Sequence, residues 1–290
     1  MLQECMDALN IKKDGIYVDA TFGGGGHSKA ILKLLGENGR LYAFDQDEEA
    51  LAQAPEDSRL TVIKANFRFA ENYLAYFEAI PVDGILADLG ISSHHIDAPE
   101  RGFAFMQNGP LDMRMDGNNG ITASEWLNQV EIRELTHALS FYGDIKNAKS
   151  LANAIQGELP IETTYKLVRA CEKVAPKQKN YAYLAKVFQA IRIAVNDEMG
   201  ALKDFLESLE KVTSENARVV IMSYHSLEDK LVKKWINSGK IDGKIEKDFY
   251  GKVIKPFSAF NKKPIEAQEK ELEKNSRSRS AKLRIAVRNA

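Results

Sequence analysis

The chain has 290 residues, of which 44% are hydrophobic and 28% are charged, as is typical of a globular protein with one large or two modest domains. It has no apolar run near the roughly 18 residues that span a bilayer, and its acidic N-terminus does not resemble a secretory signal. Two cysteines suggest neither a disulfide framework nor a metal cluster. We therefore expect a cytoplasmic protein rather than a membrane-bound or secreted one.

The net charge of −1 is unevenly distributed. Residues 241–290 contain 13 lysines and arginines and 7 acids, a local charge of +6, so the first 240 residues carry −7. The densest basic segment is 274–284. It suits contact with a phosphate backbone. It equally suits a solvated loop that leads into an edge strand, because Leu283, Ile285 and Val287 alternate with polar or small residues.

The first part of the chain alternates between expected strands and amphipathic helical segments. The strands are expected at 16–20, 40–44, 60–64 and 82–88. Such alternation is typical of parallel β-α-β units with helices on both faces of a sheet. The expected fold class is therefore α/β, with a Rossmann-like doubly wound sheet.

A glycine-rich turn follows the first expected strand, in the sequence Tyr17-Val-Asp-Ala-Thr-Phe-Gly-Gly-Gly-Gly-His27. Glycine allows a ligand to approach the backbone closely, and the start of the next helix offers free N–H groups. The second strand ends in Asp45, which is where nucleotide-binding folds place the acid that receives the ribose hydroxyls. The pair predicts a site for an adenosine-containing cofactor.

The spacing of the glycines bears on which cofactor binds. The third small residue of the dinucleotide pattern is replaced by Ser28 or Lys29, and no P-loop lysine follows. S-adenosylmethionine has no phosphates, so this loop suits it better than a nicotinamide dinucleotide. A plain tight turn in an α/β protein is the alternative.

From about residue 100 to 180 we expect short helices at 123–129, 132–141, 148–156 and 164–174, two of them capped by Thr122 and Thr163. The expected division is an α/β domain at 1–105 and 181–290, interrupted by a helical domain at 106–180. The remainder of the chain predicts one long helix over 184–209, a strand at 218–223, a helix at 227–235, a loop-like region at 238–280 and a final strand at 281–288.

Asp88 is the strongest catalytic candidate, because it ends a buried strand at the expected ligand-binding edge of the sheet. A carboxylate there can accept a hydrogen bond from an exocyclic amine and so make that amine more nucleophilic. Asp88 could instead cap the following loop or contact the cofactor. Phe67, after the third strand, could pack on an adenine ring or simply belong to the core.

Two further segments contain candidates for substrate contact. The long loop 97–116 carries Arg101 and Arg114, which could hold phosphates or stack on unpaired bases, whereas its apolar residues could seat the insertion. His225 follows the strand at 218–223 and could orient a substrate. The sequence around His225 has no hydrolase elbow, and the five histidines suggest no metal set, so we expect no metal site.

Seven segments together resemble the bacterial 16S ribosomal RNA (cytosine-N4) methyltransferases of the H type, from the first residues to the last strand. They are V-D-A-T-F-G-G-G-G-H-S, F-D-Q-D, D-G-I-L-A-D-L-G-I-S-S, R-G-F-A-F, P-L-D-M-R-M-D, V-F-Q-A-I-R-I-A-V-N-D-E and S-Y-H-S-L-E-D-K, in that order.

The resemblance implies S-adenosylmethionine as methyl donor and, as acceptor, a cytidine in the decoding region of small-subunit ribosomal RNA. It implies that the helical insertion recognises RNA, that the partner is the small ribosomal subunit, and that a dimer is one option for the oligomeric state. By position, the implied cofactor-binding residues are Gly25, Gly26, His27, Asp45, Phe67, Asp88 and His95.

This sequence departs from that family in three ways. His95 stands where glutamine is common. Lys186 and Lys230 stand where arginine is usual, which keeps the charge and loses the bidentate hydrogen bonding. The sequence also starts after the customary His-x-Pro-Val stretch, which suggests a misassigned start or a truncation.

Two alternatives to the methyltransferase expectation remain. The first is a ribosome-assembly or RNA-binding factor that has the fold without the catalysis. The second is a DNA amino-methyltransferase, although Asp88-Leu-Gly-Ile lacks the aromatic residue that those enzymes usually carry there.

Overall fold

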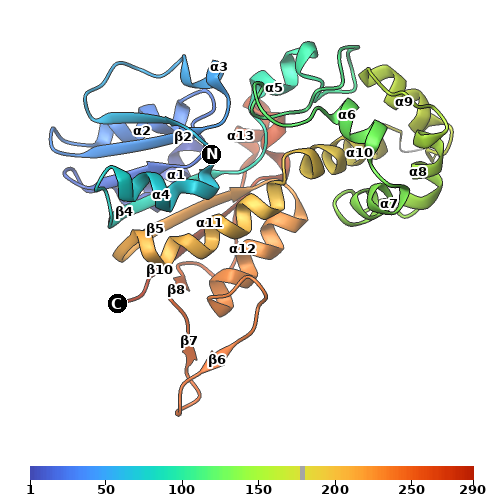
Figure 1. The fold of residues 1–290 in the computed structure, drawn as a ribbon. Coiled ribbons are helices and arrows are strands. Elements are labelled where there is room, and N and C mark those ends of the chain that lie inside the picture. The colour runs from blue at the N-terminus through green and yellow to red at the C-terminus, as the bar shows by residue number, and fades with distance from the viewer. Residues whose placement is uncertain (177–179) are drawn as a thin grey trace. The chain divides into compact units, whose positions relative to one another are not determined.

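The computed structural model describes residues 1–176 and 180–290, and these form two compact units (Figure 1). The first unit contains residues 1–90 and 199–290, and the second contains residues 91–198. The sequence placed the inserted domain at 106–180, so the second unit begins earlier and ends later than expected. The reason is packing, since Phe103 and Tyr183 both belong to the core of the second unit.

Within the described residues, the first unit is built on an eight-stranded sheet in the order β3-β2-β1-β4-β5-β10-β8, with β9 paired to β10. Strands β1 to β5 run parallel to one another, and β10 is antiparallel to β5, β8 and β9. The expected Rossmann-like α/β class is confirmed. The strands are β1 (Ile16–Asp19), β2 (Arg40–Asp45), β3 (Leu60–Lys64), β4 (Val82–Asp88), β5 (Thr213–Ser223), β8 (Phe257–Ala259), β9 (Ile265–Glu266) and β10 (Lys282–Arg288).

The strand order changes direction at β1, whose neighbours are β2 on one side and β4 on the other. Open α/β sheets bind ligands at such a switch point, outside the carboxyl ends of the strands. The topology therefore predicts that the residues following β1, β2 and β4 line the ligand-binding site.

Helices cover the sheet because its strands are apolar on both sides. On one face, Leu41 and Leu86 join a core with α1 and α2. On the other, Phe44 of β2 packs against Tyr73 of α4, with ring centroids 6.1 Å apart. The helices of this unit are α1 (Leu2–Leu9), α2 (Gly26–Leu34), α3 (Glu48–Leu51), η1 (Phe67–Phe69), α4 (Ala70–Tyr76), α11 (Glu198–Val212, with Glu198 assigned to the second unit), α12 (Ser226–Ser238), α13 (Glu269–Lys274) and η3 (Ser276–Ser280).

The second unit is helical around one apolar core. Thr122 forms a capping box with Glu125, and the side chain of Thr163 accepts a hydrogen bond from the backbone N–H of Lys166, so both expected N-caps are confirmed. Its helices are α5 (Ser93–Asp97), η2 (Pro99–Arg101), α6 (Ala123–Gln129), α7 (Ile132–Phe141), α8 (Ala148–Gln156), α9 (Thr164–Glu172) and α10 (Asn180–Val195).

The single long helix expected over 184–209 is wrong, because the chain forms α10 and α11 with a break at Asn196-Asp197. Asp197 has a φ of 46°, which no right-handed helix contains. The side chain of Asn196 accepts a hydrogen bond from the backbone N–H of Met115 at 2.7 Å and donates to the carbonyl of Met113 at 2.7 Å. The break therefore ties the end of α10 to the loop before α6.

The C-terminal region also differs from expectation. Residues 238–280 contain β8, β9 and α13, together with a two-stranded hairpin made of β6 (Glu246–Lys247) and β7 (Val253–Ile254). The expected edge strand at 281–288 is instead an interior strand, since β10 pairs with β5 on one side and with β8 and β9 on the other. Short strands of two or three residues carry too little periodicity to be recognised in sequence.

Among the described residues, no helix has both the length and the apolar character that crossing a membrane requires.

Candidate active site

The glycine turn after β1 has a conformation that only glycine accommodates. Gly25 caps α2 with a φ of 72°, and a Cβ at this position would lie 2.8 Å from the ring of Phe22. A Cβ on Gly24 or Gly26 would instead meet nothing within 4 Å. These two glycines therefore border open space, into which a ligand can approach the backbone.

Asp19, the last residue of β1, forms hydrogen bonds to this turn from the protein interior. The sequence alone did not identify it as a residue of the site. Its fully buried carboxyl accepts hydrogen bonds from the hydroxyl of Ser28 at 2.7 Å and from the backbone N–H of Thr21 at 3.2 Å. Burial raises the pKa of Asp19 to about 7, and the hydrogen bond from Ser28 opposes that rise. The residue braces the loop and faces the protein interior.

Asp45, at the end of β2, is joined directly to the glycine turn. Its Oδ2 accepts a hydrogen bond from the backbone N–H of Gly23 at 2.7 Å, and its Oδ1 accepts one from the backbone N–H of Asp47 at 2.9 Å. The structure thus brings the two halves of the expected cofactor site together.

Asp88, at the end of β4, lies at the switch point. Its backbone N–H donates to the hydroxyl of Thr21 at 2.7 Å, its Oδ1 accepts from the hydroxyl of Tyr224 at 2.8 Å, and its Oδ2 lies 3.5 Å from Nε2 of His27. About a quarter of the side chain is exposed, at 27%. Burial raises the pKa of Asp88 to about 6, while the hydrogen bond from Tyr224 lowers it. At neutral pH the carboxylate is mostly ionised and able to accept a proton.

His27, at the start of α2, is neutral and faces Asp88. Burial lowers the pKa of His27 to about 4. Its Nδ1 is buried and has no hydrogen-bond partner among the residues that the structure describes. A neutral imidazole with one unpaired nitrogen is able to bind a polar group of a ligand.

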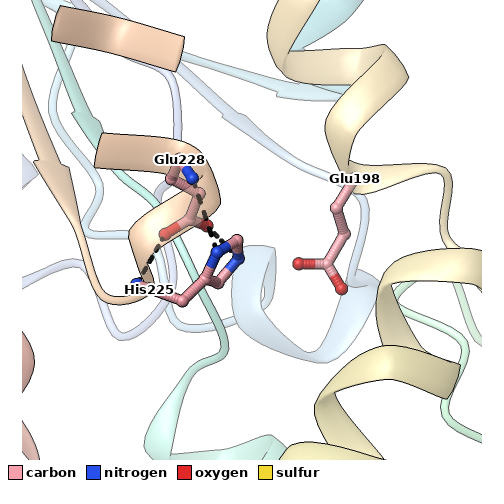
Figure 2. A group of neighbouring side chains, drawn as sticks. All are labelled: Glu198, His225 and Glu228. Carbon is pink, nitrogen blue, oxygen red and sulfur yellow. Dashed lines mark hydrogen bonds and ion pairs between the residues drawn. The ribbon is translucent and has the colours of Figure 1, made fainter. Parts of the chain in front are cut away.

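His225, just after β5, has a structural role. It is the N-cap of α12: its Nδ1 accepts from the backbone N–H of Glu228 at 3.4 Å, and its Nε2 lies 3.1 Å from Oε1 of the same residue (Figure 2). In return, Oε2 of Glu228 accepts from the backbone N–H groups of His225 and Tyr224. Figure 2 also draws Glu198, whose carboxylate pairs with Arg192 within the second unit.

The basic C-terminal segment is partly neutralised by the same helix. Asp229 of α12 accepts from Nε of Arg284 at 2.7 Å and lies 3.8 Å from the ammonium of Lys282. Both basic residues belong to β10, so part of the segment 274–284 serves the sheet. The motif H-S-L-E-D therefore shapes the loop that carries Tyr224.

The two remaining candidate cofactor-binding residues, Phe67 and His95, lie in different units. Phe67 follows β3 in the first unit, half-buried, with its ring centroid 5.2 Å from that of Phe205. His95 belongs to α5 in the second unit, where it is buried and stacked on Phe103 at 4.8 Å. The first unit alone brings Asp45, Asp88 and the glycine turn together.

The arginines of the long loop make contacts inside the second unit. Arg114 forms two hydrogen bonds with the carboxylate of Asp112, each 2.8 Å long, and Arg101 donates to the backbone carbonyls of Arg114 and Met115. Burial would raise the pKa of Asp112, but the hydrogen bonds from Arg114 outweigh it and the pKa is lowered. The pair therefore stabilises the loop itself.

The donors and acceptors at the ends of β1, β2 and β4 fit an adenosine-containing cofactor. The open space beside Gly24 and Gly26, the carboxylate of Asp45 and the unpaired Nδ1 of His27 lie at or just after the ends of β1 and β2. The glycine turn has no lysine, and the site therefore suits a ligand without phosphates.

Comparisons with known proteins show what this chain is similar to. The model of the MraW methylase family matches residues 1–289. Ribosomal RNA small subunit methyltransferase H of Amoebophilus asiaticus (strain 5a2) is 48% identical over 295 residues, which cover 100% of this chain and 95% of that relative. The protein of the same name from Cytophaga hutchinsonii is 48% identical over 293 residues, which cover 99% of this chain and 98% of that relative.

Solved structures are more distant. SMU.1697c from Streptococcus mutans, in complex with SAH, is 14% identical, with 99% of this chain and 97% of that chain covered and a TM-score of 0.42, too low to support a conclusion. The family model and the relatives confirm the expected class of enzyme, a methyltransferase that uses S-adenosylmethionine. The chain belongs to the MraW methylase family.

Proposed function

We propose that this protein transfers a methyl group from S-adenosylmethionine to N4 of a cytidine in the decoding region of small-subunit ribosomal RNA. The observation that carries the proposal is Asp88, an ionisable carboxylate held by Tyr224 at the switch point, next to the glycine turn. The relatives are named as methyltransferases of small-subunit ribosomal RNA, and these names support the choice of substrate.

Seven residues would hold the cofactor. Gly25 would keep the turn in its conformation, and Gly26 would let the cofactor approach the backbone. Asp45 would accept its ribose hydroxyls, and Nδ1 of His27 would receive a polar group. Phe67 would pack on the adenine, and Asp88 and His95 would complete the site, as the sequence resemblance implies.

S-adenosylmethionine supplies a methyl group made electrophilic by its sulfonium. Asp88 would accept a hydrogen bond from the N4 amine of the cytidine, whose lone pair is otherwise delocalised into the ring. The cofactor would supply the methyl carbon to N4 and leave as the thioether, and Asp88 or water would take the proton that the amine loses. Tyr224 and His27 would fix the orientation of the carboxylate.

The helical insertion, which the sequence predicts at residues 106–180, would recognise the RNA. Arg101, Arg114 and His225 would contribute through the loops that they stabilise. Because a paired base cannot reach the carboxylate, the target cytidine would have to leave its stack. Association with the assembled small subunit and a dimeric state belong to the same proposal.

The test is methylation of small subunits that lack the modification. The purified protein is incubated with methyl-labelled S-adenosylmethionine and these subunits, and the nucleosides are then identified by mass. Label in N4-methylated cytidine is the expected result. Tight binding of the cofactor without label would favour a ribosome-assembly factor. Label in DNA, in a parallel incubation with DNA in place of the subunits, would favour a DNA amino-methyltransferase.

A further inference from the structure

We propose that the β6–β7 hairpin, residues 240–255, is a second RNA-binding site that stacks unpaired bases on Phe249 and Tyr250. In Figure 1 the hairpin extends from the rest of the first unit, with its turn farthest away. The inference rests on the proposed function, because the RNA bound would be the same ribosomal RNA.

The two aromatic rings at the hairpin turn are almost entirely in water. Phe249 is 98% exposed and Tyr250 is 91% exposed. Their ring centroids lie 5.7 Å apart with the planes at 88°, so the rings meet edge to face and at least one face of each remains open. Nucleobases stack on open aromatic faces, and such stacking tolerates any sequence because every base has a π-face.

The turn that presents the rings is ordered by its own hydrogen bonds. Oδ1 of Asp248 accepts from the backbone N–H groups of Tyr250 at 2.9 Å and Lys252 at 2.8 Å, and the backbone N–H of Gly251 donates to the carbonyl of Asp248 at 3.0 Å. Gly251 has a φ of 82°, which a side chain would disfavour. The end of the hairpin farthest from the turn is also anchored, because the side chain of Asn289 donates a hydrogen bond to the carbonyl of Lys255 at 2.7 Å. The backbone that carries the rings therefore loses little freedom when they bind.

The charges around the rings favour RNA. The hairpin contains five lysines and three acids. Two of the acids, Glu246 and Asp242, pair with lysines, and the third, Asp248, builds the turn. Lys247 and Lys252 flank the aromatic pair, are exposed, and form no ion pair with any residue that the structure describes.

Ammonium groups beside open aromatic rings match a phosphate beside an unpaired base. The hydrophobic centre of a protein–protein interface is instead depleted in lysine. The local charge of +6 on residues 241–290 is consistent with an RNA partner.

The first experiment replaces both rings, as Phe249→Ala with Tyr250→Ala, and measures binding and methylation of unmodified small subunits. The expected result is a rise in Kd and KM of about tenfold or more, with kcat and the affinity for S-adenosylmethionine unchanged. Tyr76→Ala is the matched control, because Tyr76 is 79% exposed on α4 of the same unit. Affinity within twofold of the unmodified protein would overturn the proposal.

A second variant pair tests the charges. Lys247→Gln with Lys252→Gln should lower the slope of log affinity against log salt by about one for each lysine. An unchanged slope would show that neither lysine lies near a phosphate.

Cross-linking identifies the partner directly. A photoreactive benzoylphenylalanine in place of Phe249 should cross-link to ribosomal RNA in small subunits. A cross-link to a ribosomal protein or to a second copy of the chain would contradict the proposal. If the unmodified protein methylates its RNA and the double alanine variant does so equally well, the hairpin proposal alone fails; if the unmodified protein neither binds nor methylates RNA, the proposed function fails.

Discussion

The hydroxyl of Tyr224 donates a 2.8 Å hydrogen bond to Oδ1 of Asp88. Because Asp88 ends β4 and Tyr224 follows β5, the bond joins two neighbouring parallel strands at their carboxyl ends. Burial and the nearby Asp88 raise the pKa of Tyr224, so its hydroxyl stays protonated and remains a donor. Tyr224 thus acts as a positioning residue for the carboxylate that the proposed reaction uses.

Replacing Tyr224 with phenylalanine should move the pH dependence of methyl transfer upward. The hydrogen bond from Tyr224 lowers the pKa of Asp88, which burial has raised to about 6, so its loss raises that pKa further. A hydrogen bond to a charged group contributes about 1.5–3 kcal/mol, equivalent to about one or two pH units. The acidic limb of kcat/KM against pH should shift upward by about that amount. An unshifted limb would mean that Asp88 does not have to be ionised for the reaction.

Asp88→Asn tests the acceptor itself. The amide keeps the size of the side chain and accepts a hydrogen bond through its carbonyl, but it cannot take up a proton. We expect methyl transfer to fall by about a hundredfold or more, in the range typical of a lost acid–base group. Cofactor affinity, measured by calorimetry, should change much less. A variant that keeps the unmodified rate would remove Asp88 from the mechanism.

Asp45→Ala should weaken binding of S-adenosylmethionine. The substitution removes the proposed ribose contact and the acceptor that orders the N–H of Gly23. Since hydrogen bonds to a charged group contribute about 1.5–3 kcal/mol, the Kd should rise roughly tenfold to a hundredfold or more. Glu56→Ala removes an exposed acid of the same unit and is the control for lost charge. Equal affinities for the two variants would place the ribose elsewhere.

Most of the fold could be predicted because its signals are local. The first four strands and the helices from α6 to α9 lie at or near the residues that hydrophobic periodicity and capping threonines indicated. The break between α10 and α11 could not be predicted. It interrupts an intact apolar period and depends on hydrogen bonds between the side chain of Asn196 and the backbone of Met113 and Met115, which precede it by about eighty positions.

The candidate site was predictable where a residue ends a strand. Asp45 and Asp88 stand after apolar runs, and parallel strands bring their carboxyl ends to one edge. The roles of Tyr224 and Asp19 were not predictable, because they depend on which strands are neighbours and on the depth of burial. Charge alone did not reveal that Arg114 pairs with Asp112 two residues away.

Asn196→Ala should destabilise the second unit. It removes the side-chain hydrogen bonds of Asn196 with the backbone of Met113, Met115 and Arg192, whereas the carbonyl of Arg192 keeps the hydrogen bond from the backbone N–H of residue 196. At about 1 kcal/mol for each bond, the free energy of unfolding should fall by about 2–3 kcal/mol. Chemical denaturation measures the loss, and hydrogen exchange should quicken at the amide of Met115. Asn196→Asp keeps the acceptor for that amide and should protect it better than alanine does.

Asp19→Asn should change how stability depends on pH. In the folded protein burial raises the pKa of Asp19 to about 7 from its ordinary value of 3.8, so the folded state keeps a proton that the unfolded state loses between these values. Asp19 therefore costs stability progressively as the pH rises from about 4 to 7, and its cost is complete above the folded pKa. Asparagine resembles the protonated carboxyl: its carbonyl can accept from Thr21 and its amide can donate to Ser28.

The free energies of unfolding of Asp19→Asn and the unmodified protein should therefore diverge as the pH rises. At pH 4 the two values should be similar. At pH 8 the variant should be more stable, by an amount on the order of a few kcal/mol. Taking the difference between the two proteins cancels the titration of Asp88 and of other shared groups. A difference that stays constant from pH 4 to 8 would show that Asp19 has an ordinary pKa in the folded protein, in which case Ser28 and Thr21 would be binding a buried carboxylate that remains charged throughout.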